Sequence, residues 1–168
     1  MTSHLDYYYL KMEEHFLYVP YFHNYRRVRV LLPKDYHHET QHYPVLYMHD
    51  GQNVFYSKES YSGYSWKVIP TIKHHKEFPK MIIIGIDNAG TERLNEYSPW
   101  KTNTGSTPDT MNTGGLGAEY ARWVVEMVKP FIDRSYRTMS DRNHTLLAGS
   151  SMGGIITAYM GAAYPQVF

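Results

Sequence analysis

The chain of 168 residues contains no cysteine, which excludes disulfide bonds, thiolate nucleophiles and cysteine metal sites. It has no charge excess either, because 17 Lys and Arg against 16 Asp and Glu leave a net charge of +1. Nothing in this balance favours binding to nucleic acid or to a membrane surface. No apolar run approaches the roughly 20 residues that span a bilayer, and the first residues lack the features of a signal peptide. We therefore expect a cytoplasmic protein with neither nucleic-acid nor membrane partners.

The composition is that of an ordinary folded domain. Hydrophobic residues make up 42% and charged residues 20% of the chain, so enough apolar surface is available to offset the entropy of ordering. The length suits one hydrophobic core and is short for two. We predict a single domain over residues 1–168.

Five segments have the pattern of β-strands, and three have that of helices. The first two strands flank the turn-like His23-Asn24 and predict an antiparallel hairpin, whereas the other three are nearly continuous apolar runs, typical of strands covered on both faces. The expected strands are 15–19, 27–32, 45–50, 81–87 and 144–149, and the expected helices are 66–75, 116–133 and 153–163. Strands that alternate with helices indicate an α/β fold with a mostly parallel sheet flanked by helices.

The helix expected over 116–133 has an apolar face that includes Met127 and a polar face that includes Lys129. Pro130 is expected to kink its end or to close it into a tighter turn, because proline cannot donate a helical hydrogen bond.

The segment 149–153, Gly-Ser-Ser-Met-Gly, matches Gly-x-Ser-x-Gly only with Ser151 at its centre. An expected strand precedes it and an expected helix follows, which is the context of a nucleophile elbow. Such a turn reverses the chain sharply and exposes the serine hydroxyl, and the flanking glycines leave room where side chains would collide. We predict Ser151 as a catalytic nucleophile. The alternative is a Gly/Ser-rich turn that binds a phosphate or nothing.

The segment 49–53, His-Asp-Gly-Gln-Asn, ends the expected strand 45–50. A serine that attacks a carbonyl group needs two backbone N–H donors for the oxyanion, one from the residue after the nucleophile and one from a loop after an earlier strand. These are Met152 and Gln52. Asp50 and Gly51 are expected beside the substrate, and Gly51 allows a close approach. The alternative is a plain turn around a buried Asp50.

The segment 93–100 follows the expected strand 81–87. The residues that could line the rim of the site are Arg93, Glu96, Tyr97 and Trp100. Of these, Tyr97 and Trp100 are the candidates for substrate contacts. An ion pair and two packed aromatic side chains that hold a loop would explain the same residues. The histidine-rich segment 37–42 matches no metal-ligand spacing, so we expect no metal site and no cofactor.

Four motifs occur in a fixed order, and together they resemble a known family. They are 49–53, 96–100, 129–133 with 136–138, and 149–154. Over roughly residues 14–168 the chain resembles the Putative esterase family, the esterase D-like group of the α/β-hydrolases, whose relatives include enterochelin, feruloyl and acetyl-xylan esterases and S-formylglutathione hydrolases. The resemblance implies a carboxylic-ester hydrolase that forms an acyl intermediate at Ser151, with Gln52 and Met152 as oxyanion donors. Together with the aromatic residues expected near the site, which are Phe55, Tyr56, Tyr97 and Trp100, it also implies a small or aromatic acyl group on a polar alcohol or sugar.

The chain departs from that family pattern after Ser151. In α/β-hydrolases the nucleophile is followed by an Asp or Glu and then by a His, but residues 152–168 contain none of these. We therefore expect an inactive N-terminal fragment whose C-terminal strands are missing, with strand 144–149 left as an exposed edge through which copies could associate. The alternatives are a non-catalytic module of this fold that binds a ligand or a partner, and an acyltransferase.

Overall fold

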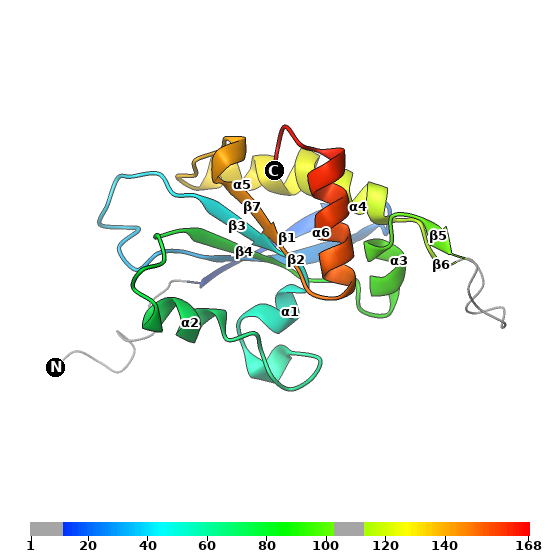
Figure 1. Ribbon diagram of the computed structural model, residues 1–168, viewed down its shortest axis with the longest axis horizontal. Coiled ribbons are helices and arrows are strands. Elements are labelled where there is room, and N and C mark those ends of the chain that lie inside the picture. The colour runs from blue at the N-terminus through cyan, green and yellow to red at the C-terminus, as the bar shows by residue number, and fades with distance from the viewer. Residues whose placement is uncertain (1–11, 103–112) are drawn as a thin grey trace.

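The computed structural model describes residues 12–102 and 113–168, which form a five-stranded sheet between two layers of helices (Figure 1). The strand order is β1-β2-β4-β3-β7. The strands are β1 (Met12–Val19), β2 (Asn24–Leu31), β3 (Val45–Met48), β4 (Ile82–Ile86) and β7 (Thr145–Ala148). All five expected strands are present, with ends that differ by a few residues, and β1 and β2 form the predicted antiparallel hairpin.

The sheet is mixed, so the expectation of a mostly parallel sheet holds for only one half. β4, β3 and β7 run parallel, whereas β2 joins β4 in the antiparallel direction. The hairpin thus contributes two of the four strand pairings. The carboxyl ends of the three parallel strands lie at one edge of the sheet, where sites form in folds of this kind.

Helices cover both faces of the sheet (Figure 1). One face carries α4 (Gly117–Trp123), α5 (Lys129–Ser135) and α6 (Met152–Ala163), and the other carries α1 (Gly51–Val54) and α2 (Val68–His74). The remaining elements are α3 (Arg93–Tyr97), the short helices η2 (Ser57–Glu59), η3 (Gly90–Glu92) and η5 (Arg142–His144), and a small ribbon of β5 (Lys101–Thr102) and β6 (Thr113–Gly114).

The core has two layers because successive strand residues point to opposite faces. Val28 and Val30 of β2 lie in one buried cluster with Val124, just after α4, and Ile156 of α6. On the other face, Leu31, Met48 and Ile83 pack with Val54 and Ile69 of α1 and α2.

The long helical segment 117–135, which precedes β7, contains a π-helical turn, η4 (Val124–Val128), between α4 and α5. This corrects the expected tighter turn at Pro130. Proline lacks the N–H and crowds the carbonyl four residues earlier, and here the helix widens, with the Lys129 N–H bonding to the Val124 carbonyl. The wider turn rotates the faces, so that Met127 is 46% exposed and Lys129 is buried, with its Nζ 2.7 Å from Asp133 and 2.9 Å from the Ser140 carbonyl oxygen.

Two further features concern the outside of the fold. β7 is the last strand of the sheet and pairs only with β3 among the described strands, which leaves Leu146 46% exposed. None of the helices in residues 12–102 and 113–168 has the length and apolar character needed to cross a membrane.

Candidate active site

Ser151 occupies the turn between β7 and α6 and has the backbone of a strained nucleophile turn. Its φ of 58° and ψ of −124° lie in a region that residues other than glycine rarely adopt. The side chain is exposed, and it caps α6 without a side-chain hydrogen bond. A strained, exposed serine at a strand-to-helix turn matches the predicted elbow, because such strain persists mainly where function requires it.

The two glycines of the motif lie where a side chain would meet neighbouring atoms. A Cβ added at Gly149 would collide with the carbonyl oxygen of Gly153, and one added at Gly153 would lie 3.1 Å from Asp50 Oδ2. The first contact is impossible without a backbone shift, and the second is tighter than ordinary packing. The turn therefore needs glycine at position 149, and a side chain at position 153 would have to displace the Asp50 carboxylate.

The turn after β3 lies beside this elbow because β3 and β7 are neighbouring parallel strands. Met48 pairs with Ala148, and the His49 N–H donates to the Ala148 carbonyl, so both chains leave the sheet at the same level. Gln52 and Met152 each lie in the first turn of a helix, where the backbone N–H has no intrahelical acceptor. The fold thus brings the two predicted oxyanion donors to the same edge.

Asp50 is the centre of the polar contacts at this edge. Its backbone is left-handed, with φ 56° and ψ 50°, and its side chain is buried. Arg93 binds the carboxylate at two points, Nε to Oδ1 at 2.6 Å and Nη2 to Oδ2 at 2.9 Å. Asn88 Nδ2 donates to Oδ1 at 2.6 Å. The pair also raises the pKa of Arg93, chiefly through its hydrogen bond to Asp50.

Asn88 was not identified from the sequence, and it also holds Gln52. The Gln52 side chain donates to the Asn88 carbonyl and to its Oδ1, both at 3.2 Å, and accepts the Asn88 N–H at 2.9 Å. The only signal for Asn88 in the sequence is its place just after β4. Arg93 was considered in the sequence, and its ion pair fits the interpretation in which this segment holds a loop.

Gly51 lies against the next strand, as expected for a close approach. A Cβ there would lie 2.6 Å from Asp87 Oδ1. Below the turn, the fully buried Arg29 donates to the Gly51 carbonyl, and its guanidinium lies 2.6 Å from Glu59 and 3.2 Å from Asp87. Arg29 therefore supports the turn from beneath, and Gly51 is buried instead of lining an open surface beside a substrate.

The structure places Tyr97 and Asp50 beneath the surface, which corrects the expected substrate contacts of both side chains. Tyr97 has no exposed surface, and its hydroxyl accepts the Asp50 N–H at 3.0 Å. Burial raises the pKa of Tyr97 well above its usual value. A fully buried phenol and a carboxylate bound by Arg93 shape the turn but cannot meet a substrate directly.

His49 is buried and is not a base for Ser151. Its Nδ1 lies 2.7 Å from the Tyr120 hydroxyl, and burial in the core lowers its pKa to about 4. Among the described residues, the Ser151 hydroxyl has no hydrogen bond to a histidine or a carboxylate. In the same part of the chain, no group of three His, Asp or Glu side chains is arranged to hold a metal ion.

Trp100 is the one predicted substrate contact that lies at the surface. It is 69% exposed, and its ring meets that of Tyr159 on α6 edge to face, with centroids 6.0 Å apart. Phe55, another aromatic residue expected near the site, is buried under the sheet. The exposed Trp100 ring, packed against the partly buried Tyr159, offers a surface for a planar or sugar ring.

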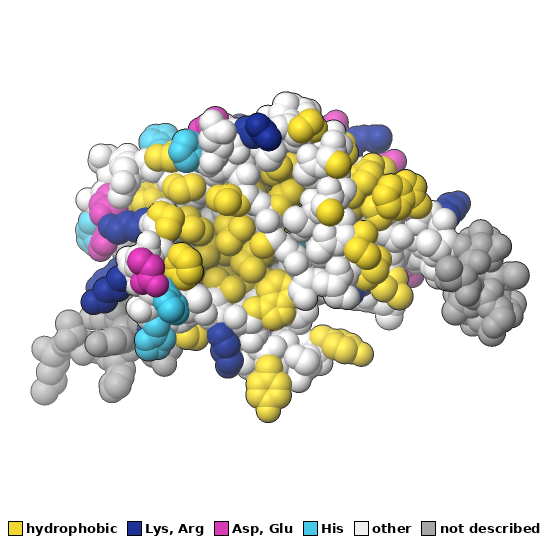
Figure 2. Space-filling view, in the orientation of Figure 1, with side chains coloured by type: hydrophobic (Ala, Val, Ile, Leu, Met, Phe, Trp, Pro, Cys, Tyr) yellow, Lys and Arg dark blue, Asp and Glu magenta, His cyan; other side chains and the backbone are white. Residues whose placement is uncertain are grey.

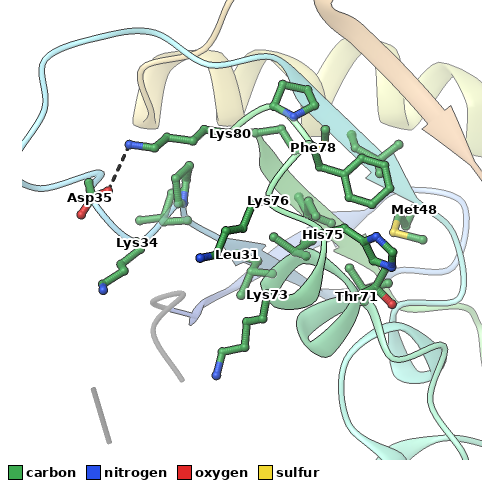
Figure 3. A pocket seen from close by; sticks show the side chains of 18 of the residues that line it. Leu31, Lys34, Asp35, Met48, Thr71, Lys73, His75, Lys76, Phe78 and Lys80 are labelled. Carbon is green, nitrogen blue, oxygen red and sulfur yellow. Dashed lines mark hydrogen bonds and ion pairs between the residues drawn. The ribbon is translucent and has the colours of Figure 1, made fainter. Parts of the chain in front are cut away.

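A separate cavity of about 900 Å³ lies between α2 and the sheet (Figure 3). Its floor is apolar, with Leu46, Met48 and Ile83 from the sheet, and lysines such as Lys34 and Lys76 stand at its rim. Figure 2 shows apolar side chains gathered over this region. Neither Ser151 nor Gln52 lines it, so this cavity is separate from the candidate active site.

Comparison with known proteins agrees with this geometry. Residues 20–168 match the family model described as Putative esterase. The chain belongs to this esterase family. The resemblance drawn from the four motifs is thus confirmed, and the elbow and the Gln52 turn both lie within the matched part.

The relatives of this esterase-family chain are distant in sequence and similar in fold. A Bacillus subtilis protein, YbbA, described as uncharacterized, is 25% identical over 143 residues, which are 85% of this chain and 53% of YbbA. An IroE-like serine hydrolase from Shewanella oneidensis has a TM-score of 0.75 and 23% identity, covering 94% of this chain and 48% of that one. A ferulic acid esterase from Anaeromyces mucronatus has a TM-score of 0.65 and 20% identity, over 95% of this chain and 56% of that one.

An enterochelin esterase from Shigella flexneri also shares the fold, with a TM-score of 0.66 and 18% identity over 94% of this chain and 34% of its own. The esterase-family chain therefore spans about half the length of the relatives it matches first.

Proposed function

We propose that the protein hydrolyses a carboxylic ester through an acyl intermediate at Ser151. The observation that carries the proposal is the backbone of Ser151, left-handed in φ and exposed at a strand-to-helix turn that glycines on both sides make possible. A turn that only connected β7 to α6 would not need this strain. Membership of an esterase family supports the same chemistry.

The chemical steps follow from the parts of the site. The Ser151 Oγ attacks the ester carbonyl carbon while its proton passes to a base, and the N–H groups of Gln52 and Met152 bind the oxyanion. The C–O bond to the alcohol breaks, and the alcohol leaves with that proton. Water then adds to the acyl-serine, which releases the carboxylic acid and restores the serine hydroxyl.

The base is the missing part of this arrangement. His49 is buried and bound to Tyr120, and no other histidine among the described residues hydrogen-bonds to Ser151. We propose that the histidine and the acid that orients it come from a part of the protein outside these 168 residues. The matched part is only 53% of YbbA and 48% of the IroE-like hydrolase, which supports that proposal. The proposal makes the 168-residue chain alone nearly inactive.

Hydrolysis of p-nitrophenyl acetate tests the function directly. We expect turnover by the natural full-length protein, loss of it in Ser151→Ala, and little change in Ser150→Ala, the matched control one residue away. The 168-residue chain alone should retain at most on the order of a thousandfold acceleration over water, from the oxyanion donors and binding. Ordinary esterase rates in that chain, abolished by Ser151→Ala, would place the base within it and contradict the proposal.

For the substrate we propose a small or aromatic acyl group on a polar alcohol or sugar. The exposed Trp100 ring, which meets the partly buried Tyr159 ring, supports an aromatic or sugar group. Two proteins of the same fold are described as ferulic acid and enterochelin esterases. Short-chain, feruloyl and long-chain esters separate the possibilities, since each buried methylene adds roughly 0.8 kcal/mol. Preference for acyl chains above about ten carbons would refute this substrate class. An ester product formed with an added acceptor alcohol would identify an acyltransferase.

A second candidate function is binding to another copy of the chain. Within residues 12–102 and 113–168, β7 pairs on one side only and Leu146 is 46% exposed. This supports the candidate, because an unpaired apolar edge is a template for strand pairing. The candidate predicts association that grows with concentration, measured by sedimentation, and does not require Ser151. A monomer at every concentration would refute it.

A further inference from the structure

Three turns at the carboxyl edge of the sheet are joined through one buried carboxylate. Asp50 belongs to the turn after β3, and Asn88 and Arg93 belong to the segment after β4. Together they give the carboxylate three hydrogen bonds, at 2.6, 2.9 and 2.6 Å. The guanidinium of Arg93 also lies over the Tyr97 ring, 5.4 Å from its centroid. The carboxylate is thus held from two sides.

These contacts hold an unusual backbone. Asp50 is left-handed, and it places Gly51 and Gln52 at the start of α1. Its N–H donates to the Tyr97 hydroxyl at 3.0 Å. Fixing the side chain and the N–H of one residue leaves the turn little freedom, so the direction of the next N–H groups is also fixed.

Asn88 adds a second connection, on the other side of Gly51. Its Nδ2 donates to Asp50, and its backbone and Oδ1 bind the Gln52 side chain in three contacts of 2.9–3.2 Å. One asparagine therefore holds the residues before and after Gly51 at the same time.

The elbow lies against the same carboxylate. Arg93 Nη2 is 3.5 Å from the Ser150 carbonyl oxygen, and the position of a Cβ at Gly153 would be 3.1 Å from Asp50 Oδ2. The Asp50 carboxylate and Arg93 therefore lie between the backbone of the Gln52 turn and the turn that carries Ser151. A change in their geometry moves one turn relative to the other.

We propose that Arg93 and Asn88 are positioning residues that act through Asp50 to aim the Gln52 N–H at the oxygen bound by the Met152 N–H. The inference rests on the proposed ester hydrolysis and adds two residues to it. Oxyanion donors act only within about 2.7–3.1 Å of the oxyanion, and a misplacement of 1 Å costs on the order of a hundredfold in rate. Stability alone explains this partly buried pair poorly, because replacing a buried ion pair by apolar side chains of similar volume is often neutral or stabilising.

The test compares an ester with its thionoester, in which sulfur replaces the carbonyl oxygen. Sulfur is a weak hydrogen-bond acceptor, so the thionoester gains little from the two N–H groups. In the natural full-length protein, Arg93→Lys keeps the charge but loses the two-point contact. We expect kcat for the ester to fall about 10- to 100-fold with KM within about twofold, and kcat for the thionoester to change less than about threefold. Asn88→Ala should act in the same direction.

Two further variants separate positioning from loss of structure. Arg122→Lys, which changes an exposed ion pair with Glu119 on α4, is the matched control and should leave both rates unchanged. Arg93→Ala should regain ester turnover when millimolar guanidinium is added, because the ion can occupy the emptied position beside Asp50.

Equal losses for the ester and the thionoester in Arg93→Lys would overturn the inference and assign the pair to stability. Unchanged kcat in Arg93→Lys, with Ser151-dependent turnover in the natural protein, would overturn it while the proposed function stands. Absence of Ser151-dependent turnover in the natural protein would refute the proposed function, and the inference with it.

Discussion

Replacing Ser151 by glycine should stabilise the fold, while replacing it by alanine should not. Both changes remove the nucleophile, so they differ only in the backbone conformations that the new residue allows. Alanine retains the strain of φ 58° and ψ −124°, because its Cβ meets the same steric limits as that of serine. Glycine adopts this conformation without strain.

The magnitude follows from two opposing terms. Relief of a strained backbone is worth about 1–3 kcal/mol, and the greater freedom of glycine in the unfolded chain costs about 0.5–1 kcal/mol. We therefore expect Ser151→Gly to exceed Ser151→Ala by about 1 kcal/mol, within a range of about 0–2.5 kcal/mol, in free energy of unfolding. A difference of about 1 kcal/mol corresponds to roughly 2–4 °C in Tm for a protein of this size.

Urea unfolding of the natural protein, followed by circular dichroism, measures both variants. The neighbouring Ser150 does not have a positive φ, so the same pair of substitutions there should show the usual order, with glycine less stable than alanine by about 0.5–1 kcal/mol. If glycine is also the less stable residue at position 151, the turn is relaxed and the argument for a strained elbow fails.

Three other predictions follow from the described contacts. In Gly149→Ala the new Cβ collides with the Gly153 backbone, so the free energy of unfolding should fall by about 3 kcal/mol or more. In the control Gly154→Ala the nearest contact is 3.5 Å, and the free energy of unfolding should change by less than about 1 kcal/mol. Equal effects of the two changes in urea unfolding would contradict this prediction. Leu146→Lys should reduce concentration-dependent association in sedimentation, since a charge on an edge strand opposes pairing, and unchanged association would exclude β7 as the contact. Burial lowers the pKa of His49 from 6.5 to about 4, so between these pH values the unfolded state binds more protons and stability falls as the pH decreases. Between pH 7 and pH 5 the free energy of unfolding of the wild type should therefore drop by about 2 kcal/mol more than that of His49→Gln. Equal drops in the two proteins would refute the assignment.

The strands, the hairpin and the elbow could be predicted because their signals are local. Continuous apolar runs determine the buried strands, and the glycine spacing around Ser151 determines the turn. The bounds of α6 differ from the expected helix by one residue at its start. The antiparallel half of the sheet could not be predicted, because nothing in the hairpin sequence shows that β2 pairs with β4.

The partners of charged residues could not be predicted, because they depend on strand order. Arg93 and Glu96 are three residues apart on α3 and suit a local ion pair. The structure instead pairs Arg93 with Asp50 and Glu96 with the buried Arg26. Tyr97 was expected at the rim for a related reason: sequence position places it after β4, but only the packing of α3 against α4 and α6 buries it.

The register of β3 against β7 also has a consequence for how the protein is made. Val45 pairs with Thr145, so the two turns of the candidate site meet across 100 residues of chain. Closing a loop of that length costs about 4 kcal/mol of entropy, whereas the strands of the β1–β2 hairpin are joined by only four residues. We expect the hairpin to form early and the β3–β7 pairing to form late. On the ribosome, the Gln52 turn must wait until the segment through Ser151 has emerged, so the first chance to assemble the site comes when the elbow leaves the exit tunnel.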